Sequence, residues 1–271
     1  MNPAIKAIIR KDFRSITANR KLFSTMLIVP LCLTVLLPSI FILVSHFAPD
    51  DPDMQKLLSL LPAGAGAESL QLTVASLILN YILPVFFLMI PIMTSSITAA
   101  SSFVGEKEKR TLETLLYCPL SVQQIFRAKV LASFLLSMLV SFLSFAAMLL
   151  FVELEAYFLM HGLLRPSLHW LLILLLLAPS LSLIAVTLIV RGSAKAKSVE
   201  ESQQSAVFLI LPLILLMVGQ FSGALLLSAL FLLGLSVLCL FLAVLLLRKA
   251  LRRFTYEMLL QNTSPSTQSQ R

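Results

Sequence analysis

Charged residues are scarce in this chain of 271 residues. They make up 13% of the sequence and hydrophobic residues make up 58%, whereas a soluble domain has about 25% charged and about 45–50% apolar residues. None of the eight glycines is followed by lysine, and no two are adjacent. The three cysteines, an odd number, offer neither a disulfide framework nor metal-ligand spacing. These absences exclude a soluble enzyme, a secreted disulfide scaffold and a nucleotide-binding P-loop.

Long uncharged runs take the place of soluble domains. A helix needs about 20 apolar residues to cross about 30 Å of hydrocarbon. The last run, Ser202–Leu247, would reach about 69 Å as one helix, so we expect it to fold back at Gly219–Gly223. We therefore predict an all-α polytopic membrane protein, with a single transmembrane domain over residues 1–271. Its six expected spans are 22–45, 76–99, 130–152, 170–190, 204–219 and 224–247.

Lysine and arginine lie almost entirely on one side of these spans. Of the 21, all but Lys56 and Arg165 fall in segments on the same side as the N-terminus. Because such residues mark the cytoplasmic side, we predict a multi-pass protein of the plasma (inner) membrane with both termini cytoplasmic. The same rule explains the net charge of +8, so membrane lipid is an expected partner and nucleic acid is not. The polar tail 262–271 is expected to be disordered.

Residues 4–20 have the pattern of a basic amphipathic helix. Asp12 interrupts the apolar face, and four basic residues occupy the opposite arc. Such a helix lies in the membrane interface, and a basic cluster that only fixes topology is the alternative. The apolar face consists of Ile5, Ile8, Ile9, Phe13 and Ile16.

A second amphipathic pattern lies in the loop between spans two and three. Leu112, Leu115 and Leu116 stand at i, i+3 and i+4, which places them in one apolar patch on a short helix. No long segment outside the membrane is available to cover this patch, so it suggests a docking surface for a partner. The alternative is a solvated loop with ordinary charge pairs.

The next helix has a clear start signal. The pair Cys118-Pro119 stops the preceding helix, because the residue before a proline is disfavoured in the helical conformation. Ser121 and Gln124 then have the spacing of a capping box, and Leu120 and Ile125 are placed for a hydrophobic staple. We therefore predict that a helix begins at Ser121 and runs into span three.

The stretch Ser102–Ser121, with Ala128-Lys129 after it, resembles the hallmark of ABC-2 type permeases. That pattern runs approximately G-E-[RK]-E-x-G-T-L-E-x-L-L-x-x-P-[LVM]-S, followed by G-K at the head of the next helix. Arg110 and Ala128 stand where the family usually has glycine. The stretch Ser193–Gln204 is similar to the second cytoplasmic loop of sodium-extrusion-type members. Many of those members have a large external region after span one, which is short here, so their substrate is not carried over.

The resemblance implies the permease subunit of an ABC exporter. Such a subunit pairs with a second permease, of the same or a different kind, and is driven by cytoplasmic ABC ATPase subunits. The chain would then be no enzyme and bind no cofactor, since ATP and Mg belong to the partner. The implied ATPase-coupling residues are Gly105, Glu106, Glu108, Thr111, Leu112, Glu113, Leu115 and Leu116. The implied second cytoplasmic contact consists of Lys195, Lys197, Glu200 and Glu201.

The spans themselves carry only mild polar groups. No aspartate, lysine or arginine lies inside them, which disfavours an ATP-independent secondary carrier. A non-transporting membrane anchor or assembly subunit is the other alternative. No histidines have metal-ligand spacing, so no metal site is predicted. The cargo, whether drug, peptide, lipid or sodium, stays open. Four residues form a possible substrate path, for which helix packing is the alternative: Asn80, Ser133, Ser137 and Ser141.

Overall fold

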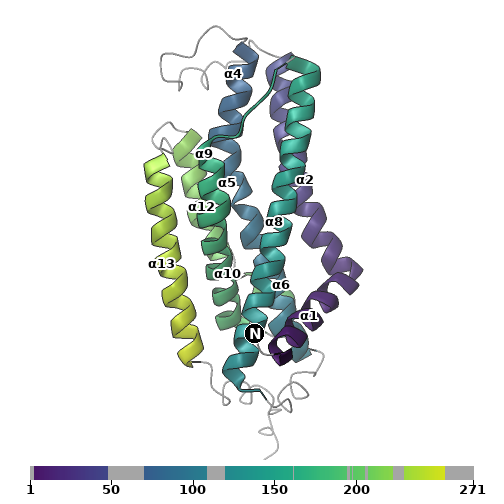
Figure 1. Ribbon diagram of the computed structural model, residues 1–271, viewed down its shortest axis with the longest axis vertical. Coiled ribbons are helices and arrows are strands. Elements are labelled where there is room, and N and C mark those ends of the chain that lie inside the picture. The colour runs from purple at the N-terminus through teal and green to yellow at the C-terminus, as the bar shows by residue number, and fades with distance from the viewer. Residues whose placement is uncertain are drawn as a thin grey trace, which may run out of the picture.

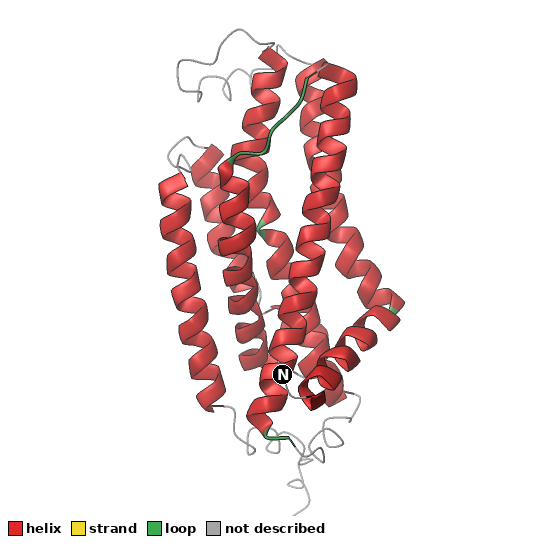
Figure 2. Ribbon diagram, in the orientation of Figure 1, coloured by secondary structure: helices red, strands yellow, loops and turns green. Residues whose placement is uncertain are grey.

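Helices make up all the regular structure in the described part of the chain, which confirms the all-α class (Figures 1 and 2). The computed structural model describes residues 3–47, 70–108, 120–160, 162–193, 196, 198–204, 207–221 and 229–253. The elements in these ranges are α1 (Pro3–Ala18), α2 (Arg20–Phe47), α4 (Leu70–Leu77), η1 (Ile78–Ile82), α5 (Leu83–Phe87), α6 (Met89–Glu108), α8 (Val122–Met160), α9 (Leu168–Leu172), η2 (Ile173–Leu177), α10 (Ala178–Ser193), α11 (Val199–Gln204), α12 (Val207–Phe221) and α13 (Ala229–Arg253).

Five helical stretches among the described residues are long and apolar enough to cross a membrane. They contain the second, third and fourth predicted spans in full, all but one residue of the first, and most of the last. The remaining predicted span corresponds to α12, which has 15 residues and is shorter than the about 20 that a crossing needs. The structure therefore confirms a membrane protein with several spans, and the number six stays a prediction. The five stretches are Leu22–Val44, Ala75–Glu106, Val122–Leu159, Leu168–Ser193 and Leu230–Leu251.

The long helices run side by side in one bundle, and α1 lies obliquely at its base (Figure 1). Helices α6 and α10 are mostly buried and form the centre, whereas α2 and α13 lie outside. Large apolar side chains on the outer helices are exposed, among them Leu36 and Ile40 on α2 and Leu238 and Phe241 on α13. A soluble protein seldom exposes contiguous apolar surface of this kind. The bundle is therefore covered by lipid.

Small polar side chains fill the interior of the bundle. Thr94 and Ser96 on α6, and Ser180 and Thr187 on α10, are all fully or almost fully buried. Each hydroxyl donates to the carbonyl four residues earlier, at 2.6–2.7 Å; for Ser180 that carbonyl, of Leu176, lies in the preceding η2 turn. Their polar groups are thereby satisfied within the helix. Small residues of this kind allow membrane helices to approach closely.

Two π-helical turns, η1 and η2, interrupt neighbouring membrane helices. Each ends with an i→i+5 hydrogen bond, from Leu83 N to the Ile78 carbonyl and from Ala178 N to the Ile173 carbonyl. A proline stands two residues after the last residue of each turn, Pro84 after η1 and Pro179 after η2. Proline lacks the N–H of a regular turn and its ring clashes with the carbonyl four residues before it, so a wider turn relieves the conflict.

Candidate functional site

Helix α1 packs against the bundle along one face. Ile8 lies with Ile125 and Ala128 of α8 in one apolar cluster, and Ile16 lies with Leu136 of α8 in another. The predicted apolar face of residues 4–20 is therefore covered by protein at these positions. Its location in the membrane interface stays a prediction.

The chain turns sharply between α1 and α2 at Asn19 (Figure 1). The Asn19 carbonyl accepts from Phe23 N at 2.9 Å, and its side-chain oxygen accepts from Leu22 N at 3.4 Å. Asparagine is one of the preferred residues for capping a helix in this way. The turn thus fixes the base of α2 relative to α1.

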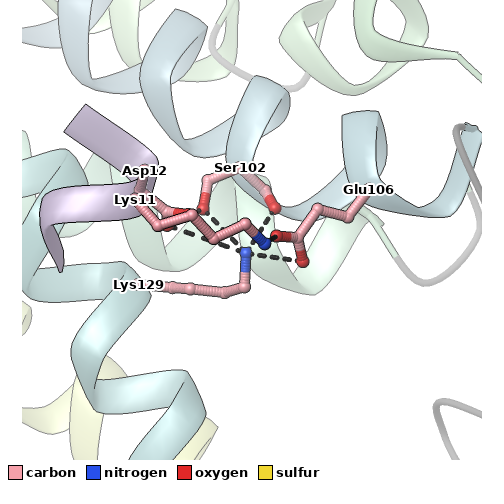
Figure 3. Close-up of polar contacts among 5 residues, drawn as sticks. All are labelled: Lys11, Asp12, Ser102, Glu106 and Lys129. Carbon is pink, nitrogen blue, oxygen red and sulfur yellow. Dashed lines mark hydrogen bonds and ion pairs between the residues drawn. The ribbon is translucent and has the colours of Figure 1, made fainter. Parts of the chain in front are cut away.

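Five polar side chains from three helices meet at the base of the bundle (Figure 3). We call Lys11 and Asp12 of α1, Ser102 and Glu106 of α6, and Lys129 of α8 the basal cluster. Lys129 Nζ lies 2.8 Å from Glu106 Oε2 and 3.7 Å from Asp12 Oδ2. It also donates to the Ser102 carbonyl at 2.7 Å and to the Ser102 Oγ at 3.1 Å. The Lys129 ammonium of α8 therefore contacts both α1 and α6.

Two further contacts complete the basal cluster. The Ser102 hydroxyl donates to Asp12 Oδ2 at 2.7 Å, and Lys11 Nζ lies 2.6 Å from Glu106 Oε1. Two carboxylates thus face two ammonium groups, so the four charges balance. The side chains of Lys129 and Asp12 are only 2% and 4% exposed. Removing one partner of a buried ion pair costs about 3–5 kcal/mol, because the other charge is left uncompensated. The cluster therefore holds α1, α6 and α8 together firmly.

The basal cluster explains the acidic residue that interrupts the apolar face of α1. Asp12 follows Ile8 by one helical turn and precedes Ile16 by another, so all three point into the bundle. Sequence reasoning missed Asp12, Lys129 and Ser102 as site residues. The signal was present, since an acid on an apolar helix face needs a buried cation, and Lys129 directly precedes the uncharged run of span three.

Burial raises the pKa of the Asp12 carboxyl above its ordinary value of 3.8. The Lys129 ammonium and the Ser102 hydroxyl act in the lowering direction, whereas Glu106 raises the pKa further and Lys11 lowers it. Burial prevails, so the folded protein binds the Asp12 proton more tightly than the unfolded chain does.

This pKa shift predicts a pH dependence of stability that Asp12→Asn removes. An acid with a raised folded-state pKa makes the protein lose stability as the pH rises from about 3.8 through the raised value. The apparent unfolding midpoint of the detergent-solubilised protein should therefore fall more steeply with rising pH in the wild type than in Asp12→Asn. Parallel curves for the two proteins would show that Asp12 does not titrate in this way.

The start of α8 has the predicted capping geometry. Gln124 N donates to Ser121 Oγ at 3.3 Å, and Ser121 N donates to Gln124 Oε1 at 3.1 Å. Leu120 packs in the same apolar cluster as Ile125. The structure thus confirms both the capping box and the staple, which position the first turns of α8 and hence Lys129.

The second predicted contact segment lies beside the end of α6. Helix α11 packs against α6, and the Val199 N at its start donates to Glu108 Oε1 at 3.0 Å. Gly105 lies at the same place, where an added Cβ would meet Val199 Cγ2 at 3.8 Å, an ordinary contact. Space alone therefore does not require glycine at position 105.

The predicted ATPase-coupling residues are only partly described. Gly105 and Glu106 are buried near the end of α6, whereas Glu108 is exposed. Glu201 is exposed on α11. These residues lie at the base of the bundle with the basal cluster. Outside the described residues lie Thr111, Leu112, Glu113, Leu115, Leu116, Lys195, Lys197 and the side chain of Glu200.

The three serines of the possible substrate path face other helices of the same chain. Ser133, Ser137 and Ser141 are all at most 1% exposed. The Ser137 and Ser182 hydroxyls are 2.6 Å apart, which joins α8 to α10, and Thr98 Oγ1 of α6 donates to the Ser133 carbonyl at 3.4 Å. These contacts favour the helix-packing interpretation, and a role in a substrate path stays a prediction.

Asn80 joins η1 to the segment that precedes α9. Its side-chain oxygen accepts from Ser167 N at 2.7 Å, and its Nδ2 donates to the Arg165 carbonyl at 3.4 Å. Trp170 makes a second connection, because its Nε1 donates to the Leu79 carbonyl in η1 at 3.1 Å. In this structure Asn80 is part of a connection between two membrane helices.

Removing the indole donor should destabilise this connection. Trp170→Phe retains an aromatic ring against Phe87 and Phe145, whose centroids lie 5.4 and 5.0 Å from that of Trp170. It leaves the buried Leu79 carbonyl without this donor, at a cost of about 1–3 kcal/mol. We expect a lower unfolding midpoint in detergent than for Leu171→Met, a control at an exposed neighbouring position. Equal midpoints for the two variants would contradict the role of the indole N–H.

The described residues contain no group of three or more His, Cys, Asp or Glu side chains placed to hold a metal ion. The charged side chains that meet in the basal cluster are instead paired with each other. Chemically, this arrangement clamps helices together.

Comparison with family models identifies a match over most of the chain. The model of the ABC-2 type transporter family matches residues 3–221, which is most of the chain and includes the basal cluster. No curated protein and no solved structure matches the chain.

Proposed function

Because the chain belongs to the ABC-2 type transporter family, and is therefore a membrane component of an ABC transporter, we propose that it is the permease subunit of an exporter. Transport is driven by separate cytoplasmic ATPase subunits. Two permease chains, alike or different, form the translocation path across the plasma membrane. Both termini lie in the cytoplasm, as the distribution of lysine and arginine indicates.

One observation carries the coupling part of the proposal. The segment 109–119, which contains the predicted apolar patch, connects the end of α6 to the start of α8, and these two ends are joined by the Lys129–Glu106 ion pair. A force on the segment therefore acts on two paired helix ends. The Glu108–Val199 hydrogen bond adds the second predicted contact to the same place.

A partner must supply the nucleotide site. The chain has no P-loop sequence, since none of its glycines precedes lysine. ATP and Mg therefore bind to the ATPase subunits. The family of the chain and the predicted docking patch both support an arrangement in which this chain forms the membrane path and a separate subunit hydrolyses ATP.

In the proposed mechanism, α6 and α8 carry the movement of the ATPases into the membrane. ATP-driven closure of the two ATPases displaces the segment 109–119, which carries the predicted docking patch, in each permease. The basal cluster keeps the ends of α6 and α8 together, so both move as a unit. Helix α6 also packs along α10 in the centre of the bundle, which carries the displacement into the membrane.

The partner can be identified directly. We expect affinity purification of the tagged chain from its native membrane in mild detergent to recover a P-loop ATPase in stoichiometric amount, identified by mass spectrometry. Recovery of the intact chain without an ATPase would contradict the proposal and favour a secondary carrier. An ATPase that is recruited but shows no turnover stimulated by any cargo would favour the anchor. The cargo class is then accessible by screening drugs, lipids, peptides and sodium for stimulation of ATP hydrolysis.

A further inference from the structure

We propose that the start of the membrane stretch Leu168–Ser193 binds a phospholipid, with Arg165 at the lipid phosphate and a row of exposed leucines along an acyl chain. The site lies at the end of the bundle opposite the basal cluster (Figure 1). It is a fixed position for a membrane lipid and requires neither a cargo nor an ATPase. The inference therefore goes beyond the proposed function and can fail separately from it.

The first step is the depth of Arg165 in the bilayer. It stands three residues before Leu168, where the membrane stretch begins. Arg191, near the other end of the same stretch, comes 23 residues after Leu168, which corresponds to about 35 Å along a helix. Because the hydrocarbon is about 30 Å thick, Arg165 and Arg191 both fall at headgroup level, on opposite surfaces.

Helix α13 gives the same depth. It packs against α9, and its upper end lies at about the height of α9 in Figure 1. Its uncharged residues 230–247 end at Arg248 and measure about 27 Å, close to the thickness of the hydrocarbon. The start of α9 therefore marks the outer edge of the hydrocarbon, and Arg165 lies just beyond it.

The second step is that the Arg165 guanidinium is available to a ligand. Arg165 is exposed, and the ion pairs formed among the described residues all belong to the basal cluster. A guanidinium matches a phosphate group, to which it donates two parallel hydrogen bonds. An exposed arginine at headgroup level is therefore suited to bind a lipid phosphate.

The third step is that the backbone around Arg165 is fixed. Asn80 of η1 donates to the Arg165 carbonyl at 3.4 Å and accepts from Ser167 N at 2.7 Å. The neighbouring Leu164 is buried in the main apolar core, and Ser167 Oγ lies 2.8 Å from His169 Nδ1. A segment that is already ordered loses less entropy when it binds a ligand.

The fourth step is the uncovered apolar row below Arg165. Leu168, Leu171 and Leu175 are 66%, 55% and 57% exposed. Their spacing of three and four residues places them on one face of the helix, which descends from the headgroup level into the hydrocarbon. Close contact with a second helix favours small residues, whereas this face carries leucines. An arginine above such a row matches the phosphate and the acyl chain of one phospholipid.

The test compares how two photoreactive lipids label this row. The protein is reconstituted into phosphatidylcholine vesicles that contain a small fraction of phosphatidylglycerol, or of phosphatidylcholine, with a diazirine on the acyl chain. Labelled residues are identified by mass spectrometry. The exposed Leu233 and Val237 of α13, in the same half of the bilayer, provide the reference. Relative to them, we expect phosphatidylglycerol to label residues 168–175 about fivefold more than phosphatidylcholine does, since an arginine attracts anionic lipid by about this factor.

A variant and a matched control assign this preference to Arg165. Arg165→Gln should reduce the ratio to that of the reference positions. The substitution leaves the backbone groups that bind Asn80 in place, so the segment should keep its structure. Arg191→Gln removes the same charge from an exposed position at the other end of the stretch and should leave the ratio unchanged.

Three outcomes would overturn the proposal. The first is equal labelling of the row by both lipids in the wild type, and the second is a ratio that Arg165→Gln does not change. The third is weak labelling by either lipid together with cross-links between two chains, which would show that a second copy covers the row. None of these measurements involves an ATPase, so the proposed permease function would stand in each case.

Discussion

Lys129→Met should severely destabilise the protein. The substitution leaves Asp12 and Glu106 in the basal cluster with Lys11 as the one remaining ammonium, and Lys11 is half-exposed and contacts only Glu106 among them. Loss of one partner from a buried ion pair costs about 3–5 kcal/mol, and a folded protein has only about 5–15 kcal/mol in total. We expect a much lower yield of monodisperse protein from detergent extracts and a lower unfolding midpoint.

A matched control and a double variant define this prediction. Arg127→Met removes the same charge from an exposed position two residues earlier on α8, and it should behave as the wild type does. Asp12→Asn/Lys129→Met removes one uncompensated carboxylate as well, so it should be more stable than the sum of the single effects predicts. A Lys129→Met protein as stable as Arg127→Met would show that the ion pairs contribute nothing to the bundle.

Leu115→Asp should abolish co-purification of the ATPase. The predicted docking patch places Leu115 in an apolar contact with the partner, and a carboxylate there would be buried without a cation. Central interface residues of this kind contribute about 2–4 kcal/mol, which corresponds to about 30- to 700-fold weaker binding. The bundle itself should remain intact, because the segment 109–119 lies outside its membrane-spanning helices.

Thr114→Asp is the matched control for this substitution. On a helix, position 114 lies on the face opposite Leu112, Leu115 and Leu116, so the same new charge should leave ATPase binding nearly unchanged. The two variants are compared by the amount of ATPase recovered per permease. Normal recovery with Leu115→Asp, or equal loss with both variants, would contradict an apolar docking face at Leu115.

Local signals in the sequence were sufficient to predict local structure. The capping box of Ser121 and Gln124 depends on residues three apart, and both of its hydrogen bonds form as predicted. The long uncharged runs predicted membrane helices because crossing a bilayer requires a fixed length of apolar residues. The break predicted at Gly219–Gly223 falls largely outside the described residues, which stop at Phe221 of α12 and resume at Ala229 of α13, so it stays a prediction.

Contacts between distant residues were not predictable in the same way. Periodicity identifies Asp12 as an interruption of an apolar face, but its partners lie about 90 and 117 positions away in the chain. The π-helical turns were missed because Pro84 predicts a kink without its geometry. The donation from Trp170 to the Leu79 carbonyl depends on the pairing of two membrane helices, which no single stretch of sequence encodes.

Site-specific photo-cross-linking in the native membrane tests the central claim, that a cytoplasmic ATPase docks on the segment between α6 and α8. A photoreactive amino acid is introduced at Leu115, and the cross-linked protein is identified by mass spectrometry. The same amino acid at Tyr157, exposed towards the other end of α8, serves as the control. We predict that position 115 captures a P-loop ATPase and that position 157 does not. Capture of only lipid or the permease itself at position 115 would contradict the account.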